Sequence, residues 1–125
     1  MMKNMVFTLL FSVFLFVTVG CEQKSAPQPD SKMVIKPGGI YSCNNGGGNF
    51  GIVKVLVVED GSVHVMMYGN QFKERPKTID PKELQVFIGH APMSEAGFRK
   101  SEPFPLMVQS VTEAELEGYR LWKNR

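Results

Sequence analysis

The sequence predicts an α+β domain built on a small antiparallel β-sheet, SH3-like or barrel-like, with short helical turns and one C-terminal helix. Two observations lead to this fold class. Residues 50–58 and 62–68 are β-favouring runs, and the Asp60-Gly61 pair between them is typical of a two-residue hairpin turn. Residues 112–115, Thr-Glu-Ala-Glu, have the pattern of a capping box that opens a helix.

The predicted hairpin is apolar on both of its faces. With a turn at Asp60 and Gly61, the expected cross-strand pairs are Glu59 with Ser62, Val57 with His64, Val55 with Met66 and Val53 with Tyr68. Apolar residues then lie on both faces of the hairpin, and neither face is mainly polar. Both faces must therefore be covered by other parts of the protein. A closed barrel, or a curled sheet with a helix packed outside, would cover both, and we expect this architecture.

Shorter signals place the remaining elements. Asp80 and Pro81 fit the N-cap and the first position of a helical turn. Further elements are expected as strands at 40–43, 85–88 and 104–111 and as a short helical turn at 94–98. On the C-terminal helix, Leu116, Tyr119 and Trp122 recur every three residues, with Leu121 at the margin, and this apolar stripe should dock on the sheet.

The first 20 residues have the pattern of a bacterial export signal. Lys3 supplies a positive charge, and the chain from Met5 to Val19 is almost wholly apolar. This run of about 15 residues is shorter than the roughly 20 that a membrane-crossing helix needs. The residues at the end of this run, Thr18-Val19-Gly20-Cys21, resemble the lipobox of bacterial lipoproteins. The resemblance implies cleavage before Cys21 and acylation of its thiol.

A lipobox implies that lipid on Cys21 holds the mature protein on a membrane. Several acyl chains anchor far more firmly than one, because each buried CH₂ contributes about 0.8 kcal/mol. Glu22 follows the cysteine, and in enteric-type bacteria a residue other than Asp there favours the outer membrane, on its periplasmic face. The alternative is an ordinary secretory signal cut near Gly20, which would leave a soluble periplasmic protein.

Composition and charge limit the possible partners of the mature chain. The full chain has 125 residues, with 14 Lys and Arg against 12 Asp and Glu. Removing residues 1–20 takes away one positive charge, so the formal charge becomes 13 minus 12, or +1. This balance gives no reason to expect a nucleic-acid partner. Residues 21–36, with the lipidated cysteine, are rich in Pro, Gln, Lys and Ser and predict a flexible tether, and residues 37–125 predict a single domain.

Cys43 is the one thiol left if Cys21 carries lipid, so no internal disulfide is expected. A thiol-dependent enzyme would pair Cys43 with His64 or His90, but only the residue types support this pairing. The same three residues lack the paired spacing of zinc sites. We therefore expect a buried and unreactive Cys43, no catalytic residues, no cofactor and no metal.

The most distinctive stretch of the domain is Tyr68–Pro76, where aromatic, amide and charged residues follow the hairpin directly. Loops at the ends of sheets often carry binding groups. Tyr68, Asn70, Phe72 and Arg75 are therefore the candidate partner-binding residues. The alternative is a structural loop in which Phe72 plugs the end of the barrel and Arg75 lies in solvent.

Five segments of the domain resemble a family of small uncharacterised bacterial proteins. They are Phe-Gly-Ile-Val-Lys-Val-Leu at 50–56, Val-His-Val at 63–65, the loop at 70–76, Gly-His-Ala-Pro-Met-Ser at 89–94 and Thr-Glu-Ala-Glu-Leu-Glu-Gly-Tyr at 112–119. Phe50 and Met66 depart from the Tyr and Arg that are usual in the family. The resemblance implies no activity and transfers no functional residue, but some members occur near toxin systems, which points to immunity.

We therefore expect a lipid-anchored cell-envelope protein whose domain is a non-enzymatic protein-binding module. Its small size, its anchor and the absence of a convergent catalytic set in the sequence motivate this interpretation. An immunity protein that neutralises a periplasmic toxin is the first alternative, and an enzyme that uses the Cys43 thiol is the second.

Overall fold

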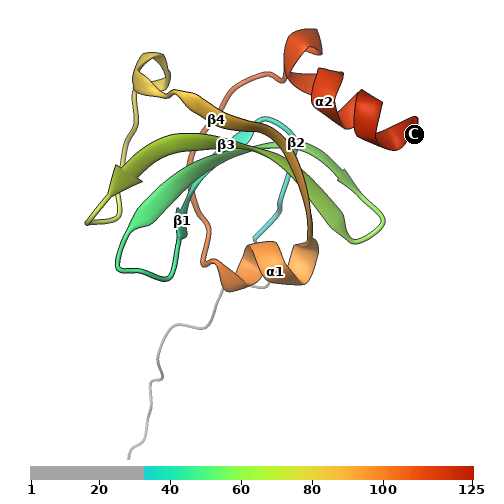
Figure 1. The fold of residues 1–125 in the computed structure, drawn as a ribbon. Coiled ribbons are helices and arrows are strands. Elements are labelled where there is room, and N and C mark those ends of the chain that lie inside the picture. Colours follow the sequence, from blue (N-terminus) through green and yellow to red (C-terminus); the bar gives the residue numbers. More distant parts are fainter. Residues whose placement is uncertain (1–32) are drawn as a thin grey trace, which may run out of the picture.

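A computed structural model describes residues 33–125, in which a curved antiparallel sheet has one α-helix on each face (Figure 1). The strands are β1 (Gly39–Asn44), β2 (Phe50–Glu59), β3 (Ser62–Phe72), β4 (Val86–Ser94) and β5 (Phe104–Val108), in the spatial order β4-β3-β2-β1-β5. The helices are η2 (Pro81–Glu83), a single 3₁₀ turn, α1 (Glu95–Lys100) and α2 (Glu113–Lys123). The predicted signal, Cys21 and most of the tether lie outside the described residues.

The sheet is open. β4 and β5 form its two edges and do not pair with each other. The predicted α+β class is confirmed, but the predicted barrel-like closure is wrong. Closure was expected because both faces of the hairpin are apolar. The structure meets the same requirement with a separate covering layer on each face, so the edges need not meet.

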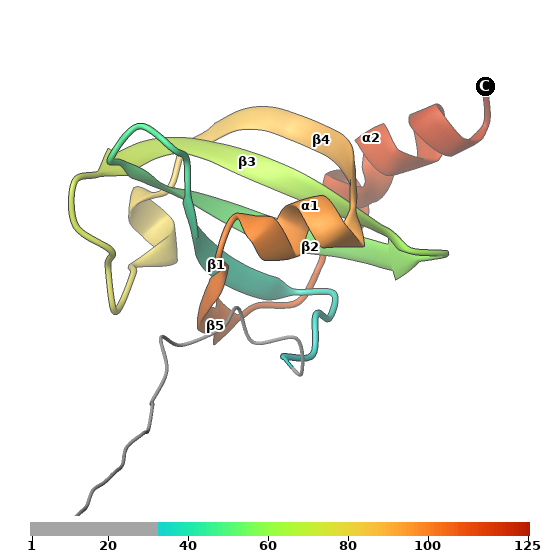
Figure 2. The same cartoon turned by 90° about the horizontal axis from the view of Figure 1, so that it is seen from below.

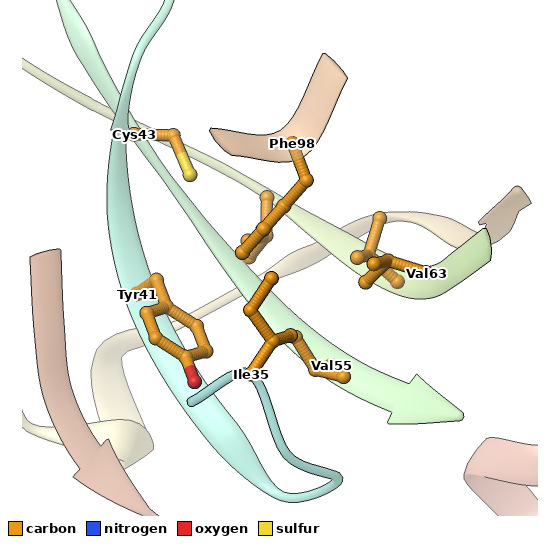
Figure 3. Packing of buried hydrophobic residues seen from close by; sticks show 8 residues of the cluster. Ile35, Tyr41, Cys43, Val55, Val63 and Phe98 are labelled. Atoms are coloured by element: carbon orange, nitrogen blue, oxygen red, sulfur yellow. The ribbon is translucent and has the colours of Figure 1, made fainter. Parts of the chain in front are cut away.

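The concave face of the sheet carries the first core cluster, which α1 covers (Figures 1 and 2). Its buried members are Ile35, Tyr41, Cys43, Val53, Val55, Val63, Val65 and Phe98 (Figure 3). Phe98 of α1 is 1% exposed and meets the Tyr41 ring edge-on, with 5.4 Å between ring centroids. Ile35 lies two residues before the predicted start of the domain, so the entering chain already contributes to the core.

The opposite face carries the second cluster, beneath α2 and the loop of residues 73–85. Its buried members are Ile40, Ile52, Leu56, Met66 and Tyr68. Ile79 and Leu84 of the loop and Leu116 of α2 pack against it. The predicted apolar stripe of α2 therefore docks on the sheet as expected, and Leu121 at its margin remains 70% exposed.

The predicted hairpin turn forms at Asp60 and Gly61, whose φ angles are 51° and 76°. Two successive positive φ angles are what a two-residue hairpin turn of the favoured type requires, and Asp-Gly tolerates them well. Glu59 faces Ser62 across the turn, as predicted.

A β-bulge between Val55 and Val57 changes the register farther from the turn. The observed partners are His64 for Val57, Val65 for Val55 and Met67 for Val53, whereas the sequence predicted Met66 for Val55 and Tyr68 for Val53. A bulge adds one residue to one strand only, so beyond it the facing residues change sides. Val53 and Val55 consequently share the α1 face with Val63 and Val65, while Met66 and Tyr68 belong to the second cluster.

The helical segments begin at the predicted positions. The Asp80 carboxylate accepts from the Lys82 backbone N–H at 2.9 Å, with Pro81 in the first helical position. The predicted turn at 94–98 is a short helix, α1, whose cap is Ser94. The predicted strand at 85–88 continues to Ser94, and the one expected at 104–111 ends at Val108.

A buried ion pair ties the first turn of α2 to the sheet. Lys54 of β2 is 1% exposed, and its Nζ lies 2.9 Å and 3.2 Å from the carboxylate oxygens of Glu115. The Lys54 ammonium also donates to the Ser110 carbonyl at 2.9 Å. Glu115 completes the capping box, because its carboxylate accepts from the Thr112 N–H and its own N–H donates to the Thr112 hydroxyl. Burial alone would raise the pKa of Glu115, but Thr112 and Lys54 hold it below its usual value.

Replacing Glu115→Gln should destabilise the protein strongly. The variant keeps a capping acceptor but leaves the Lys54 ammonium buried without its counter-charge, and breaking a buried pair in this way costs about 3–5 kcal/mol. Glu113→Gln is the matched control on the same helix, because the Glu113–Arg120 pair is exposed and should contribute less than about 1 kcal/mol. Urea unfolding of the two variants measures the difference, and equal losses would contradict the role of Lys54.

Candidate functional site

Two of the four predicted partner-binding residues are engaged within the domain at the end of β3. Tyr68 belongs to the second core cluster, and burial raises its pKa to about 12. The Asn70 amide donates to the Glu83 carbonyl and accepts from the Gln85 N–H, both at 3.0 Å. Asn70 thereby joins the two ends of the loop, and neither side chain points freely into solvent.

The other two predicted residues hold the loop against the sheet. Phe72 packs against the second cluster. Arg75 donates to the carbonyl and to the hydroxyl of Ser42 at 2.9 Å and 2.8 Å, and its guanidinium lies 4.7 Å from the centre of the Phe50 ring. Arg75 is therefore not the solvated side chain of the structural alternative. The loop predicted for residues 68–76 is wrong in its first part, because β3 continues to Phe72 and Arg75 alone of the four residues lies in the loop. The hydrogen bonds of Asn70 and Arg75 hold that loop against the sheet.

Cys43 lies in the first core cluster, on the face that α1 covers. Burial raises the pKa of its thiol. His64 sits between Val63 and Val65 on β3, and because successive strand residues point to opposite faces, it lies on the other side of the sheet. The structure thus does not bring Cys43 together with the histidines.

The two histidines meet each other. Nδ1 of His64 lies 2.9 Å from Nε2 of His90, and the rings are nearly coplanar, with 11° between their planes. Nε2 of His64 lies 4.0 Å from a Glu59 oxygen, which favours the proton on that nitrogen. Nδ1 of His64 then accepts from the His90 Nε2–H. Sequence analysis missed this pair, because 26 residues separate its members and only the strand pairing brings them together.

Helix α2 covers the histidine pair. The rings of Tyr119 and Trp122 each lie 4.8 Å, centre to centre, from the His64 ring, which is 1% exposed. Gly118 allows this close approach, since a Cβ there would lie 2.9 Å from the Cβ of His90. The predicted stripe is therefore core packing around two polar rings.

Glu59 fastens the C-terminal half of α2 beside the pair. It accepts from the Tyr119 hydroxyl and, at 2.8 Å, from the Lys123 ammonium. The hydrogen bonds from Lys123 and Tyr119 lower the pKa of Glu59. The carboxylate thus stays charged and joins the end of β2 to the helix.

The outer edge of β4 is apolar and exposed. Val86, Phe87 and Ile88 are 57%, 76% and 37% exposed. The strand reads Val-Phe-Ile-Gly-His-Ala-Pro-Met-Ser and carries no charged residue. Natural edge strands are often protected by charges, and residues 86–88 carry none, although Pro92 and two register shifts interrupt the edge of β4.

An open cavity flanks β4 on each face of the sheet. On the α2 face, a cavity of about 450 Å³ lies between the strand and the helix, with Val86, His90, Glu117 and Leu121 among its lining residues. On the other face, a cavity of about 210 Å³ is lined by residues that include Phe87, Ile88, Met67 and Gln71. The β4 edge with its two cavities is the candidate site.

Within residues 33–125, no three or more His, Cys, Asp or Glu side chains are grouped so that they could hold a metal ion. None of the helices in that range has the length and apolar character needed to cross a membrane. Comparisons with protein-family models, curated proteins and solved structures gave no match. The candidate site is therefore interpreted from its own geometry.

The histidine pair should make stability depend on pH. Burial lowers the pKa of His64 and His90, and for His90 the neighbouring His64 lowers it further. The unfolded chain, with histidine pKa values near 6.5, therefore binds more protons than the folded one below that pH. The histidine contribution is fully present above about pH 6.5 and is lost as the pH falls, by at most about 1.4 kcal/mol per proton and pH unit.

Urea unfolding at pH 7.0 and pH 5.5 tests this dependence. In His90→Gln the difference between the two free energies of unfolding should shrink. Carboxylates are a poor alternative source, because the Glu59 pKa lies below its usual 4.5 and titrates outside this window. An unchanged difference in the variant would show that the pair is not responsible.

Proposed function

We propose that this protein is a lipid-anchored cell-envelope protein whose domain binds a protein partner, without catalysis, through the outer edge of β4. The observation that carries the proposal is the run of three exposed apolar residues, 86–88, on an uncharged edge strand. Exposed apolar side chains beside open cavities are typical of interaction sites.

The geometry supports binding better than thiol chemistry. A nucleophilic cysteine needs access and a lowered pKa, whereas Cys43 is buried and its pKa is raised. A base must lie within hydrogen-bonding reach of the nucleophile, whereas His64 bonds to His90 on the other face of the sheet. These contacts argue against an enzyme that uses the Cys43 thiol.

The path of the chain is consistent with an anchor on Cys21. The described chain enters the domain on the face that α1 covers, where Met33 and Ile35 pack on the first cluster. Helix α2 and the larger cavity lie on the opposite face (Figure 1). An anchor that precedes Met33 would thus leave the α2 side of β4 accessible to other envelope proteins.

A photo-crosslinking residue in place of Phe87 tests the binding surface in intact cells. We expect a covalent adduct of discrete mass, because Phe87 is the most exposed residue of the apolar edge. The same residue in place of Lys100, which is exposed on α1, is the control and should give no such adduct. Equal labelling at both positions, or none at position 87, would refute the proposal. Mass spectrometry of the adduct shows whether the partner is a toxin, as the immunity alternative requires.

Cys21→Ser should abolish acylation, because the thiol is the group that accepts lipid in the pathway that the lipobox resembles. Intact-mass measurement of the mature N-terminus decides the point better than fractionation, since an uncleaved apolar segment could retain some precursor on the membrane. The wild-type protein should begin at Cys21 with added lipid mass. A mature protein that begins at another residue, or at Cys21 without lipid, would contradict the proposed anchor. The proposed binding surface does not depend on this result.

A further inference from the structure

Resting on the proposed function, we infer that the partner presents an extended segment that pairs with the outer edge of β4 as an added strand. Alternate apolar side chains of that segment occupy the two flanking cavities, and a lysine or arginine of the segment faces Glu117. The partner is thus recognised by the pairing of its backbone with β4, by apolar side chains at alternate positions and by one positively charged side chain.

The backbone of β4 is suited to strand addition. β4 is the outermost strand, with β3 as its one neighbour in the sheet. In an antiparallel pair, residues that exchange hydrogen bonds with the neighbour alternate with residues that do not. Away from the two register shifts of β4, the residues that do not exchange hydrogen bonds with β3 direct their N–H and C=O groups outward, where an added strand bonds to them.

The two cavities match the side-chain alternation of such a strand. Successive residues of an added strand point to opposite faces of the sheet. One set would lie over Phe87 and Ile88 on the α1 face, and the other over Val86 and Leu121 on the α2 face. In this mode of recognition, main-chain bonds supply affinity and the pockets for alternate side chains supply specificity.

Glu117 supplies the charge preference. It lines the cavity on the α2 face and is exposed. Two other glutamates of α2 are neutralised, Glu113 by Arg120 and Glu115 by Lys54, whereas Glu117 forms no ion pair within residues 33–125. A basic side chain on the partner would pair with it at the rim of the cavity.

The sequence of β4 argues against a second copy of this chain as the partner that pairs with it. β4 contains no lysine or arginine, so a second β4 would bring nothing to pair with Glu117. Pro92 lacks an N–H, and register shifts interrupt the pairing of β4 with β3 near Phe87 and His90. The register of β4 is regular from Ala91 to Ser94 and is interrupted twice between Val86 and Ala91, so the outer edge offers short stretches of backbone that suit a short peptide segment better than a long strand.

Selection from a phage-displayed library of random twelve-residue peptides tests the inference on the full-length protein in detergent. We expect enriched peptides with apolar residues at every second position and a lysine or arginine among them. The best peptide, labelled with fluorescein, is then titrated by fluorescence anisotropy. Glu117→Gln should weaken its binding about three- to tenfold, and Glu113→Gln on the same helix should leave it unchanged.

N-methylation of the peptide gives a readout that is specific for strand pairing. Methyl groups on one alternate set of amides should abolish binding, because those N–H groups bond to β4, and methyl groups on the other set should not. Phe87→Glu should also abolish binding while leaving the thermal midpoint unchanged, since Phe87 is exposed.

Three results would overturn strand addition. They are a library that yields no binder, binders without alternation, and binding that is insensitive to which amides carry methyl groups. Self-association of the chain in sedimentation experiments, abolished by Phe87→Glu, would identify a second copy as the occupant instead. The crosslink from position 87 to the cellular partner does not depend on peptides, so it shows separately whether the proposed function itself fails.

Discussion

The Lys54–Glu115 ion pair is the contact on which the arrangement of α2 depends. No residue of α2 is fully buried, so apolar burial alone holds the helix weakly. Lys54 lies inside the sheet and needs a counter-charge, because an unpaired buried ammonium is very unfavourable. Glu115 meets that need and starts the helix in the same position. The wall of the larger cavity, which α2 forms, therefore depends on a polar contact made by the central part of the sheet.

Sequence analysis predicted the elements that depend on local chemistry. Asp60 and Gly61 adopt the φ angles that their turn needs, and the Thr112–Glu115 capping box depends on residues three apart. The bulge between Val55 and Val57 was not predictable in this way, because Val and Ile fill β2 and no residue marks the interruption. The bulge then decided which valines face α1. Local signals thus gave the strands but not the assignment of their faces.

The candidate site at the β4 edge could not be predicted from the sequence for a related reason. Tyr68, Asn70, Phe72 and Arg75 were selected as residues of a binding loop, yet the first three belong to β3 and all four make contacts within the domain. Residues 86–88 look like any buried strand in the sequence. They are exposed because β4 is outermost, and strand order is a property of the whole chain. The His64–His90 contact arises from the same strand pairing.

The two core clusters lie on opposite faces of one sheet, and this separation has a dynamic consequence. Helix α2 contributes Leu116 to the margin of the second cluster and nothing to the first, so a local opening of α2 would leave the first cluster intact. Local opening of this kind has a lower free energy than global unfolding, and amide hydrogen exchange reports it. The cavity between α2 and β4 thus takes one wall from this helix, whereas strands and the β1–β2 loop form the cavity on the α1 face. An opening of α2 would therefore alter the first cavity and leave the second unchanged.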